Sequence, residues 1–274
     1  MFYQPKTLEE ALALKAEFGL GARFLAGGTD VVVQMKKGRL ALERVIDLSR
    51  LRDLAEARLE DDVCYVGALC THRALEAWPI PVLAAAARQV GGPQIRNRGT
   101  VGGNVGTASP AGDVSVALLA LDATVDLAGV GGTRAMPLRD FFVGVGKTAI
   151  APDELITGFR FRRPAKSGFY KNGKRHSVAI SVVSAGACVW EDGSVALALG
   201  SVAATPLRLT GTEAFLRERG LGAEAIAEAG RLATEEVRPI TDHRASADYR
   251  RAVSGVAVSR LLSQLQGGKH DALV

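Results

Sequence analysis

The chain has 274 residues, of which 47% are hydrophobic and 23% are charged, as in an ordinary globular protein of one or two domains. A net charge of +5 is a mild basic excess, and no run of Lys and Arg is long enough to follow a nucleic-acid backbone. The sequence lacks a signal-peptide pattern and an apolar stretch of membrane-spanning length, so we expect a cytoplasmic protein without membrane insertion.

Residues 1–55 are predicted to form a first α/β unit. Thr7-Leu8-Glu9-Glu10 has the form of a capping box, which predicts a helix from about residue 8 that ends before Gly19. Residues 22–26 predict a short buried strand, and Gly27-Gly28-Thr29-Asp30 ends it. The other elements expected in this unit are a helix over 31–35 and a strand over 44–48.

Residues 56–166 are predicted to form a second α/β unit around a long glycine-rich stretch. Residues 91–112 have little apolar periodicity, and loops of this length inside a domain are usually functional. We therefore expect a functional loop here. The elements predicted around it are strands over 63–67, 124–127 and 155–161, and helices over 71–77, 81–89 and 114–121.

Residues 167–274 are predicted to form a C-terminal α+β domain, which follows a linker over 162–168. Apolar runs on either side of Asp192-Gly193 predict a β-hairpin with strands over 179–190 and 194–201. Helical periodicity then recurs in three segments, 207–219, 223–236 and 247–266.

Two glycine loops carry the clearest chemical signal. One is Leu25-Ala26-Gly27-Gly28-Thr29-Asp30, and the other runs from Gly99-Thr100-Val101-Gly102-Gly103-Asn104 to Ala108-Ser109-Pro110-Ala111-Gly112-Asp113. Successive N–H groups without Cβ obstruction form concavities that bind anions, and two facing loops suit a pyrophosphate. Neither loop is GxGxxG or a Walker loop, and plain paired-glycine turns remain the alternative. The residues alone therefore indicate a nucleotide or phosphate site.

Metal binding and acid/base catalysis find little support in the sequence. Cys64, Cys70 and Cys188 lack the CxxC spacing of a cluster or zinc site, and the four histidines have no metal-ligand spacing. We therefore expect no metal ligand and no catalytic residue in this chain.

The motifs together resemble a known family. Besides the two loops, the similar segments are Gly92-Pro93-Gln94-Ile95-Arg96-Asn97, Asp153-Glu154-Leu155-Ile156, Tyr170-Lys171 with Arg175, and a tail from Pro239 to Arg251. In this order they resemble the FAD-binding (medium) subunits of the xanthine dehydrogenase and carbon monoxide dehydrogenase family of molybdenum hydroxylases. The resemblance covers essentially the whole chain.

The resemblance implies an α+β fold of the vanillyl-alcohol-oxidase type, in which two α/β subdomains, 1–55 and 56–166, enclose noncovalent FAD and 167–274 follows. It places the pyrophosphate on backbone N–H groups and hydroxyls of 25–30 and 100–104, beside Ser109. Asp113 would bond a ribose or ribityl hydroxyl. Ile156 and Tyr170 would lie against the flavin ring and Lys171 near its edge, where a cation raises the flavin potential.

The resemblance also implies partners. Electrons would pass from a molybdopterin in a large subunit, through 2Fe–2S clusters in a small subunit, to FAD in this chain, and then to NAD or another acceptor. A stand-alone flavin oxidoreductase of the same fold is the main alternative. A scaffold that has lost its flavin is a weaker one, because both glycine loops are intact.

Overall fold

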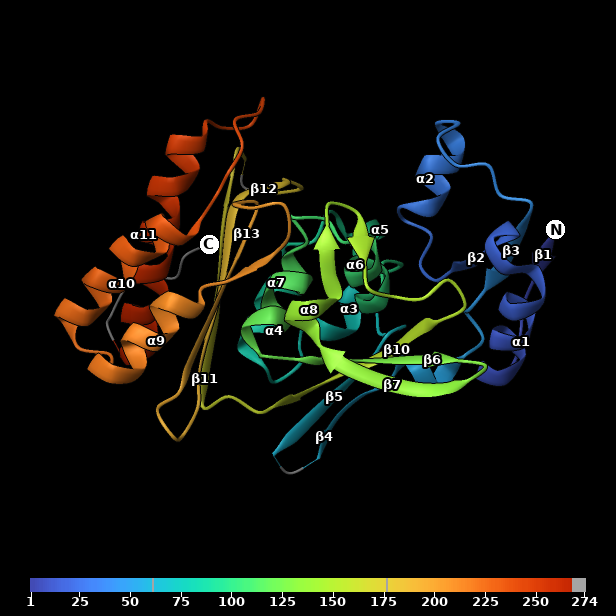
Figure 1. Ribbon diagram of the computed structural model, residues 1–274, viewed down its shortest axis with the longest axis horizontal. Coiled ribbons are helices and arrows are strands. Elements are labelled where there is room, and N and C mark those ends of the chain that lie inside the picture. Colours follow the sequence, from blue (N-terminus) through green and yellow to red (C-terminus); the bar gives the residue numbers. More distant parts are fainter. Residues whose placement is uncertain (61, 176, 268–274) are drawn as a thin grey trace.

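The computed structural model describes residues 1–60, 62–175 and 177–267 and contains three main sheets in a row (Figure 1). The N-terminal part, the central sheet with its helices, and the C-terminal sheet with its helices follow one another along the longest axis. This mixed α and β architecture matches the predicted fold class. Within the described ranges, no helix combines the length and the apolarity needed to cross a bilayer.

The N-terminal part is a three-stranded parallel sheet with helices beside it. Helix α1 begins where the capping box predicts: Thr7 accepts a hydrogen bond from the Glu10 N–H at 3.2 Å, and Glu10 accepts one from the Lys6 N–H at 2.8 Å. The sheet order is β1-β3-β2. The elements are β1 (Phe2–Tyr3), α1 (Leu8–Phe18), β2 (Ala22–Leu25), α2 (Val31–Lys36) and β3 (Arg44–Asp47).

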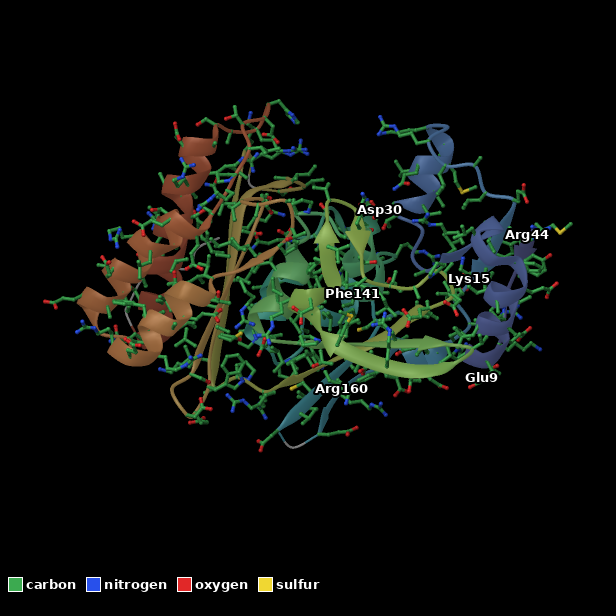
Figure 2. All side chains as sticks on the ribbon, in the orientation of Figure 1. Glu9, Lys15, Asp30, Arg44, Phe141 and Arg160 are labelled. Atoms are coloured by element: carbon green, nitrogen blue, oxygen red, sulfur yellow. The ribbon has the colours of Figure 1, made fainter. Side chains whose placement is uncertain are left out.

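The central part is an antiparallel sheet of order β4-β5-β10-β6-β7, with Phe141 packed in the core beside it (Figure 2). Its strands are β4 (Ala57–Glu60), β5 (Val63–Gly67), β6 (Thr124–Gly129), β7 (Gly132–Pro137) and β10 (Leu155–Arg162). The other elements are α3 (His72–Leu75), α4 (Pro81–Arg88), α7 (Asp113–Ala120), α8 (Leu138–Phe141), and the two-stranded β8 (Phe142–Gly144) and β9 (Lys147–Thr148).

The stretch 91–112 is not the continuous loop that its composition predicts. It contains α5 (Pro93–Arg96) and α6 (Val101–Thr107). Thr100 caps α6, and Val101 and Val105 face the core with no exposed surface. The low helix propensity of Gly102, Gly103 and Gly106 hides this helix in the sequence, because tertiary packing overrides propensity here.

The C-terminal part is a sheet of order β11-β12-β13-β14 with a three-helix layer. The predicted hairpin is confirmed, with Gly193 at a φ of +77° in its turn. The linker expected over 162–168 is wrong, because β10 reaches Arg162 and β11 starts at Lys166. The elements are β11 (Lys166–Gly173), β12 (Ser181–Val189), β13 (Val195–Gly200), β14 (Leu207–Arg208), α9 (Thr210–Arg219), α10 (Ala223–Glu236) and α11 (Ala247–Gln266).

Helices cover both faces of the C-terminal sheet. Helices α9 and α11 pack on one face, while α4 and α7 of the central part pack on the other. Gly186 on β12 permits this approach, since a Cβ there would lie 2.9 Å from the Cβ of Ala120 on α7. β12 and β13 are therefore buried along nearly their whole length. The three-way division of the chain at residues 55 and 166 stays a prediction.

Candidate functional site

The first glycine loop joins β2 to α2. Gly28 has a φ of +76°, a conformation that L side chains rarely adopt. Within the described part of the chain, the backbone N–H groups of residues 26–30 donate no hydrogen bond. Asp30 stands exposed at the start of α2 (Figure 2). The loop thus presents a run of free donors, which is what an anion-binding concavity requires.

The two glycine loops meet, as their sequences suggest. A Cβ on Gly27 would lie 1.9 Å from the carbonyl oxygen of Arg98 and 3.0 Å from the Cα of Gly99. No side chain fits between the two backbones. The absence of a side chain at residue 27 therefore brings the end of β2 against the loop that starts α6.

In the second loop, the hydrogen-bond donors that can face a ligand belong to side chains rather than to the backbone. The N–H groups of residues 101 and 102 donate to Cys70 and Ala68, and those of 103 and 104 donate to the Thr100 side chain and carbonyl. The Asn104 Oδ1 accepts from the Ser115 N–H at 3.1 Å and its hydroxyl at 2.9 Å. The Asn104 NH2 group and the Thr100 hydroxyl proton give no hydrogen bond to the described residues. They are the donors that this loop can turn toward a ligand.

Asp113 and Lys171 form a buried ion pair between the central and C-terminal parts. The Lys171 Nζ lies 2.6 Å from the Asp113 Oδ2 and 2.9 Å from the carbonyl oxygen of Gln89. The Ser181 hydroxyl donates to the other Asp113 oxygen at 2.6 Å. Burial raises the pKa of Asp113, and Lys171 and Ser181 oppose that shift by stabilising the carboxylate. The expected flavin-edge cation is therefore paired rather than free.

The other predicted contact residues lie nearby in different elements. Ile156 on β10 is 6% exposed, and its Cδ1 would lie 3.6 Å from a Cβ on Gly106 of α6. Tyr170 on β11 is half-buried beside Lys171 and lines a cavity. The Ser109 hydroxyl oxygen accepts from the Ala111 N–H at 3.3 Å, in the loop before Asp113.

That cavity, of about 640 Å³, lies where the start of α5 faces the end of β11. Five of its described lining residues are basic, and none of them is acidic. Arg96 is paired with Glu76 at 2.6 Å, and Lys171 with Asp113. The remaining basic residues are Arg88, Lys174 and Arg175, of which Lys174 and Arg175 donate to backbone carbonyls.

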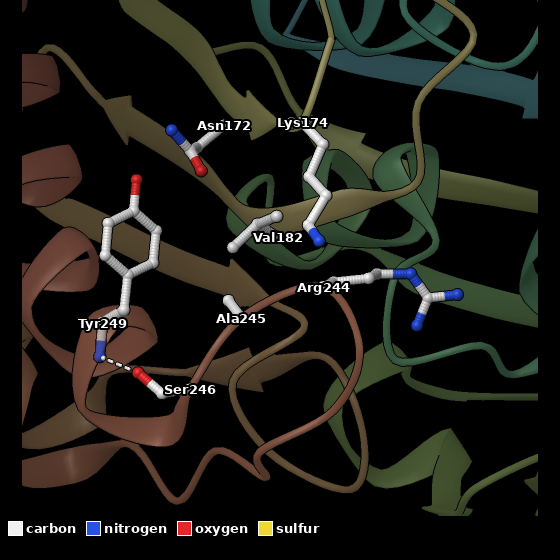
Figure 3. Close-up of a pocket in the computed structure, with 8 residues that line it drawn as sticks. Asn172, Lys174, Val182, Arg244, Ala245, Ser246 and Tyr249 are labelled. Carbon is white, nitrogen blue, oxygen red and sulfur yellow. Dashed lines mark hydrogen bonds between the residues drawn. The ribbon is translucent and has the colours of Figure 1, made fainter.

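A smaller pocket of about 410 Å³ shares residues 172–174 with this cavity. Lys174 and Arg244 lie on the side opposite Tyr249, with the Arg244 guanidinium pointing away from Tyr249 (Figure 3). The Arg244 guanidinium is paired with Asp242 at 2.8 Å. The two pockets thus adjoin at the end of β11.

His72 lies directly under the second glycine loop. It is 3% exposed, and its Cδ2 would lie 3.0 Å from a Cβ on Gly99. Its Nδ1 has no hydrogen-bond partner among the described residues. Burial, with Arg96 nearby, lowers the pKa of His72 to about 4, so the ring is neutral at pH 7.

Several residues of this region escape sequence reasoning. Ser181, Ala68 and Gln89 hold Asp113, Gly102 and Lys171 respectively. Nothing local in their types marks them, because each acts across a long sequence separation. Gly91-Gly92 was a usable signal, since these paired glycines line the basic cavity.

Two family models cover nearly the whole chain. The FAD binding domain in molybdopterin dehydrogenase matches residues 1–163, and the CO dehydrogenase flavoprotein C-terminal domain matches residues 168–265.

Relatives of known role are similar over their full length. The nicotinate dehydrogenase FAD-subunit of Eubacterium barkeri is 37% identical, covering 98% of each chain. The carbon monoxide dehydrogenase medium chain of Hydrogenophaga pseudoflava is 31% identical, covering 96% of this chain and 95% of that one. A solved structure of the carbon monoxide dehydrogenase from that organism superposes with a TM-score of 0.90 at 31% identity, covering 97% and 96% of the two chains.

The residues present fit FAD. The free N–H groups of 26–30 suit a diphosphate, and Gly27 leaves no side chain between the loops that would hold it. The amide of Asn104 and the hydroxyl of Thr100 add donors beside them. Asp113 and Lys171 supply charged groups, and Tyr170 an aromatic ring, in elements outside the two glycine loops.

Proposed function

Since the chain belongs to the FAD-binding subunits of the molybdenum hydroxylase family, we propose that it works as the electron-transfer subunit of a multi-subunit dehydrogenase. The observation that carries the proposal is the junction at Gly27, where a loop of free N–H donors meets the start of α6. FAD supplies the ability to take up and release electrons. The molybdopterin lies in a large partner subunit and the 2Fe–2S clusters in a small one.

Each residue of the site then has a role toward FAD. Within the loop 25–30, the free N–H groups of residues 26–30 donate to the diphosphate, and Thr100 and Asn104 donate through their side chains. Val101, Gly102 and Gly103 allow FAD to approach the backbone closely but do not donate to it, because their N–H groups are already bonded within the chain. Ser109 and Asp113 receive sugar or ribityl hydroxyls. Ile156 and Tyr170 contact the flavin ring, and Lys171 lies at its edge.

The electron acceptor in this proposal is NAD. The basic cavity shares Tyr170 and Lys171 with the proposed flavin site, and none of its described lining residues belongs to the two glycine loops. Arg88, Lys174 and Arg175 have no carboxylate partner among the residues that the structure describes, and they suit the diphosphate of a second dinucleotide. A neutral acceptor such as a quinone would form no ionic interaction with these basic residues.

The first experiment is an absorption spectrum of the purified chain, followed by chromatography of the cofactor that heat releases. We expect a flavin spectrum and released, noncovalent FAD. The complex assembled with its large and small subunits should transfer electrons from substrate to this flavin, whereas the chain alone should oxidise no substrate. Turnover by the isolated chain would support the stand-alone oxidoreductase instead, and a colourless chain that takes up no FAD would overturn the proposal.

The acceptor is tested with Arg88→Gln and Lys174→Gln in the assembled complex. Each should raise the KM for NAD about tenfold, because a charge-assisted hydrogen bond contributes about 1.5 kcal/mol. The KM for a small neutral quinone should not change. Arg219→Gln on the exposed end of α9 makes the same charge change away from the cavity and serves as the control. An unchanged KM for NAD in both variants would exclude this docking site.

A further inference from the structure

The tail from Pro239 to Arg251 is held together by the carboxylate of Asp242. Asp242 accepts from the backbone N–H of Arg244 at 2.8 Å and from the Arg250 guanidinium at 2.7 Å. Several hydrogen bonds from cationic and backbone donors keep its pKa well below the usual range, despite partial burial. Asp242 is therefore ionised, and it fixes the guanidinium of Arg250.

Arg250 in turn clamps two strand ends. It is 2% exposed, and it donates to the carbonyl oxygens of Val182 at 2.7 Å and Ser201 at 3.0 Å. Val182 lies at the start of β12, and Ser201 follows the end of β13. A buried arginine with this many bonds is a rigid cross-link between α11 and the sheet, because its planar fork loses little entropy per bond.

Ser201 connects this clamp to the proposed cofactor loops. Its N–H donates to the carbonyl oxygen of Pro110 at 2.7 Å, and its hydroxyl donates to the carbonyl oxygen of Ser181 at 2.9 Å. Its φ of +64° is uncommon for a residue with a side chain, and such strain persists only where the surroundings enforce it. Ser201 thus joins the 108–112 loop to the start of β12.

The hydrogen bonds continue from Ser181 to the Asp113–Lys171 ion pair. Ser181 donates through its hydroxyl to Asp113 at 2.6 Å, and Asp113 holds Lys171 at 2.6 Å. Hydrogen bonds therefore run without a gap from Asp242 through Arg250, Ser201 and Ser181 to this pair. All the residues that make these hydrogen bonds lie within the described part of the chain.

We infer that Asp242 and Arg250 are positioning residues for the flavin edge: through Ser201 they set the positions of the Pro110 loop and of the Asp113–Lys171 pair. Neither residue touches the proposed cofactor site. The tail motif would then act on FAD affinity and potential without contacting FAD. This inference rests on the proposed function, because it assumes that FAD lies beside Lys171.

The test compares Arg250→Met with Arg251→Met in the full chain. Arg251 is the next residue on α11, and its exposed pair with Asp248 makes it a matched control. We expect Arg250→Met to weaken FAD binding about tenfold, the lower end of what removal of a supporting residue costs at metal sites. If Arg250→Met weakens the binding of oxidised and of reduced FAD by factors that differ about tenfold, the two-electron potential of the bound flavin shifts by about 30 mV. Arg251→Met should change neither quantity.

Three further variants separate an effect on positioning from an effect on stability. Val258→Ala removes a buried side chain of α11 and should lower thermal stability without moving the potential. Arg250→Lys keeps a charged donor and should restore part of the potential shift. Ser201→Ala removes only the hydroxyl bond to Ser181 and should shift the potential in the same direction as Arg250→Met, even if Arg250→Met fails to fold.

The outcomes distinguish the inference from the proposed function. A wild-type chain that takes up no FAD contradicts the proposed function itself. A wild-type chain that binds FAD, with a potential unchanged in Ser201→Ala and in any folded Arg250 variant, overturns the inference alone. A potential that moves equally in Val258→Ala would also overturn it, since general loosening of α11 would then explain the shift.

Discussion

A single backbone position, Gly27, decides whether the two glycine loops meet. Gly27→Ala places a Cβ 1.9 Å from the carbonyl oxygen of Arg98, and neither backbone can yield without moving its loop. We expect FAD affinity to fall by at least about 100-fold, as for a buried clash of about 3 kcal/mol. Isothermal titration of the apo chain with FAD measures the effect.

The control for this prediction is Gly131→Ala, which places a Cβ in open space at an ordinary backbone conformation. It should bind FAD like the wild type. Gly28→Val should also abolish binding, because a β-branched residue is strained at the φ of +76°. Full flavin occupancy in Gly27→Ala would place the pyrophosphate elsewhere.

His72 makes the stability of the chain depend on pH. Burial lowers its pKa to about 4, so the folded state stays neutral while the unfolded state protonates near its ordinary pKa of 6.5. The folded state therefore loses stability as pH falls from 6.5 to 4, by at most about 3 kcal/mol, and is unaffected above pH 7. Urea unfolding at pH 7 and pH 4.5 measures the loss.

His72→Gln removes this titration and should flatten the profile between the two pH values. His243→Gln changes an exposed histidine and should keep the wild-type profile. An identical acid loss in His72→Gln and wild type would show that other groups dominate.

Residue types indicated that the two glycine loops come together, but they did not predict how these loops are hydrogen-bonded. The glycine pairs and the Thr and Asn beside them indicated two facing loops, and Gly27 against Arg98 confirms that the loops meet. The sequence could not show that the N–H groups of 101–104 are already bonded. It also could not pair Lys171 with Asp113, because that pairing depends on how the C-terminal sheet packs against α7.

At the scale of elements, an irregularity in β10 positions Ile156. The pairing of β10 with β6 shifts register between Ile156 and Gly158, so Thr157 is the extra residue. The carbonyl oxygen of Thr157 accepts from the Ala68 N–H at 2.9 Å, and the Ala68 carbonyl oxygen accepts from Gly102 at 2.7 Å. The irregularity thus connects β10 to the start of α6.

Gly158→Ala should disturb this arrangement by displacing Tyr65. The new Cβ would lie 2.5 Å from atoms of the Tyr65 ring, whose hydroxyl donates to Thr157 at 3.2 Å. We expect a loss of about 1–3 kcal/mol in unfolding free energy, the usual cost of overpacking. Tyr65→Ala should remove most of that loss, which a double-mutant cycle in urea measures as a coupling between the two sites. Additive effects would contradict the contact.

Periodicity predicted long elements well and short ones poorly. Helices α9, α10 and α11 lie within the predicted segments, because apolar residues recur there at helical spacing. Helix α6 was missed since three of its seven residues are glycine. β11 was missed because Lys166–Gly173 lacks a run of β-branched residues and is buried by α4 and α11 rather than by its own pattern.

At the scale of the whole molecule, the central part shares a hydrophobic core with each of its neighbours, while a further core lies entirely within the C-terminal sheet and its helices. The largest core contains Phe159 and Leu118 of the central part together with Phe169, Cys188 and Ala198 of the C-terminal sheet. The N-terminal core likewise includes Ala128 and Leu155 from the central sheet. Sequence patterns could not show that the parts share apolar surfaces, because strands buried on both faces read as continuous apolar runs that do not reveal what covers each face.

Because the central part shares one core with the C-terminal sheet and another with the N-terminal part, the apo chain should unfold in a single cooperative transition. Calorimetry should give a van't Hoff enthalpy equal to the calorimetric enthalpy, the criterion for two-state unfolding. Gly186→Val, which forces β12 away from Ala120 on α7, should lower the transition temperature of the whole chain rather than split the transition. Val256→Ala on the exposed face of α11 should leave the temperature within about 2 °C of wild type, as expected of a surface change below about 0.5 kcal/mol. Two resolved transitions in the wild type would mean that the C-terminal sheet and the central part fold independently, despite the apolar faces that they share.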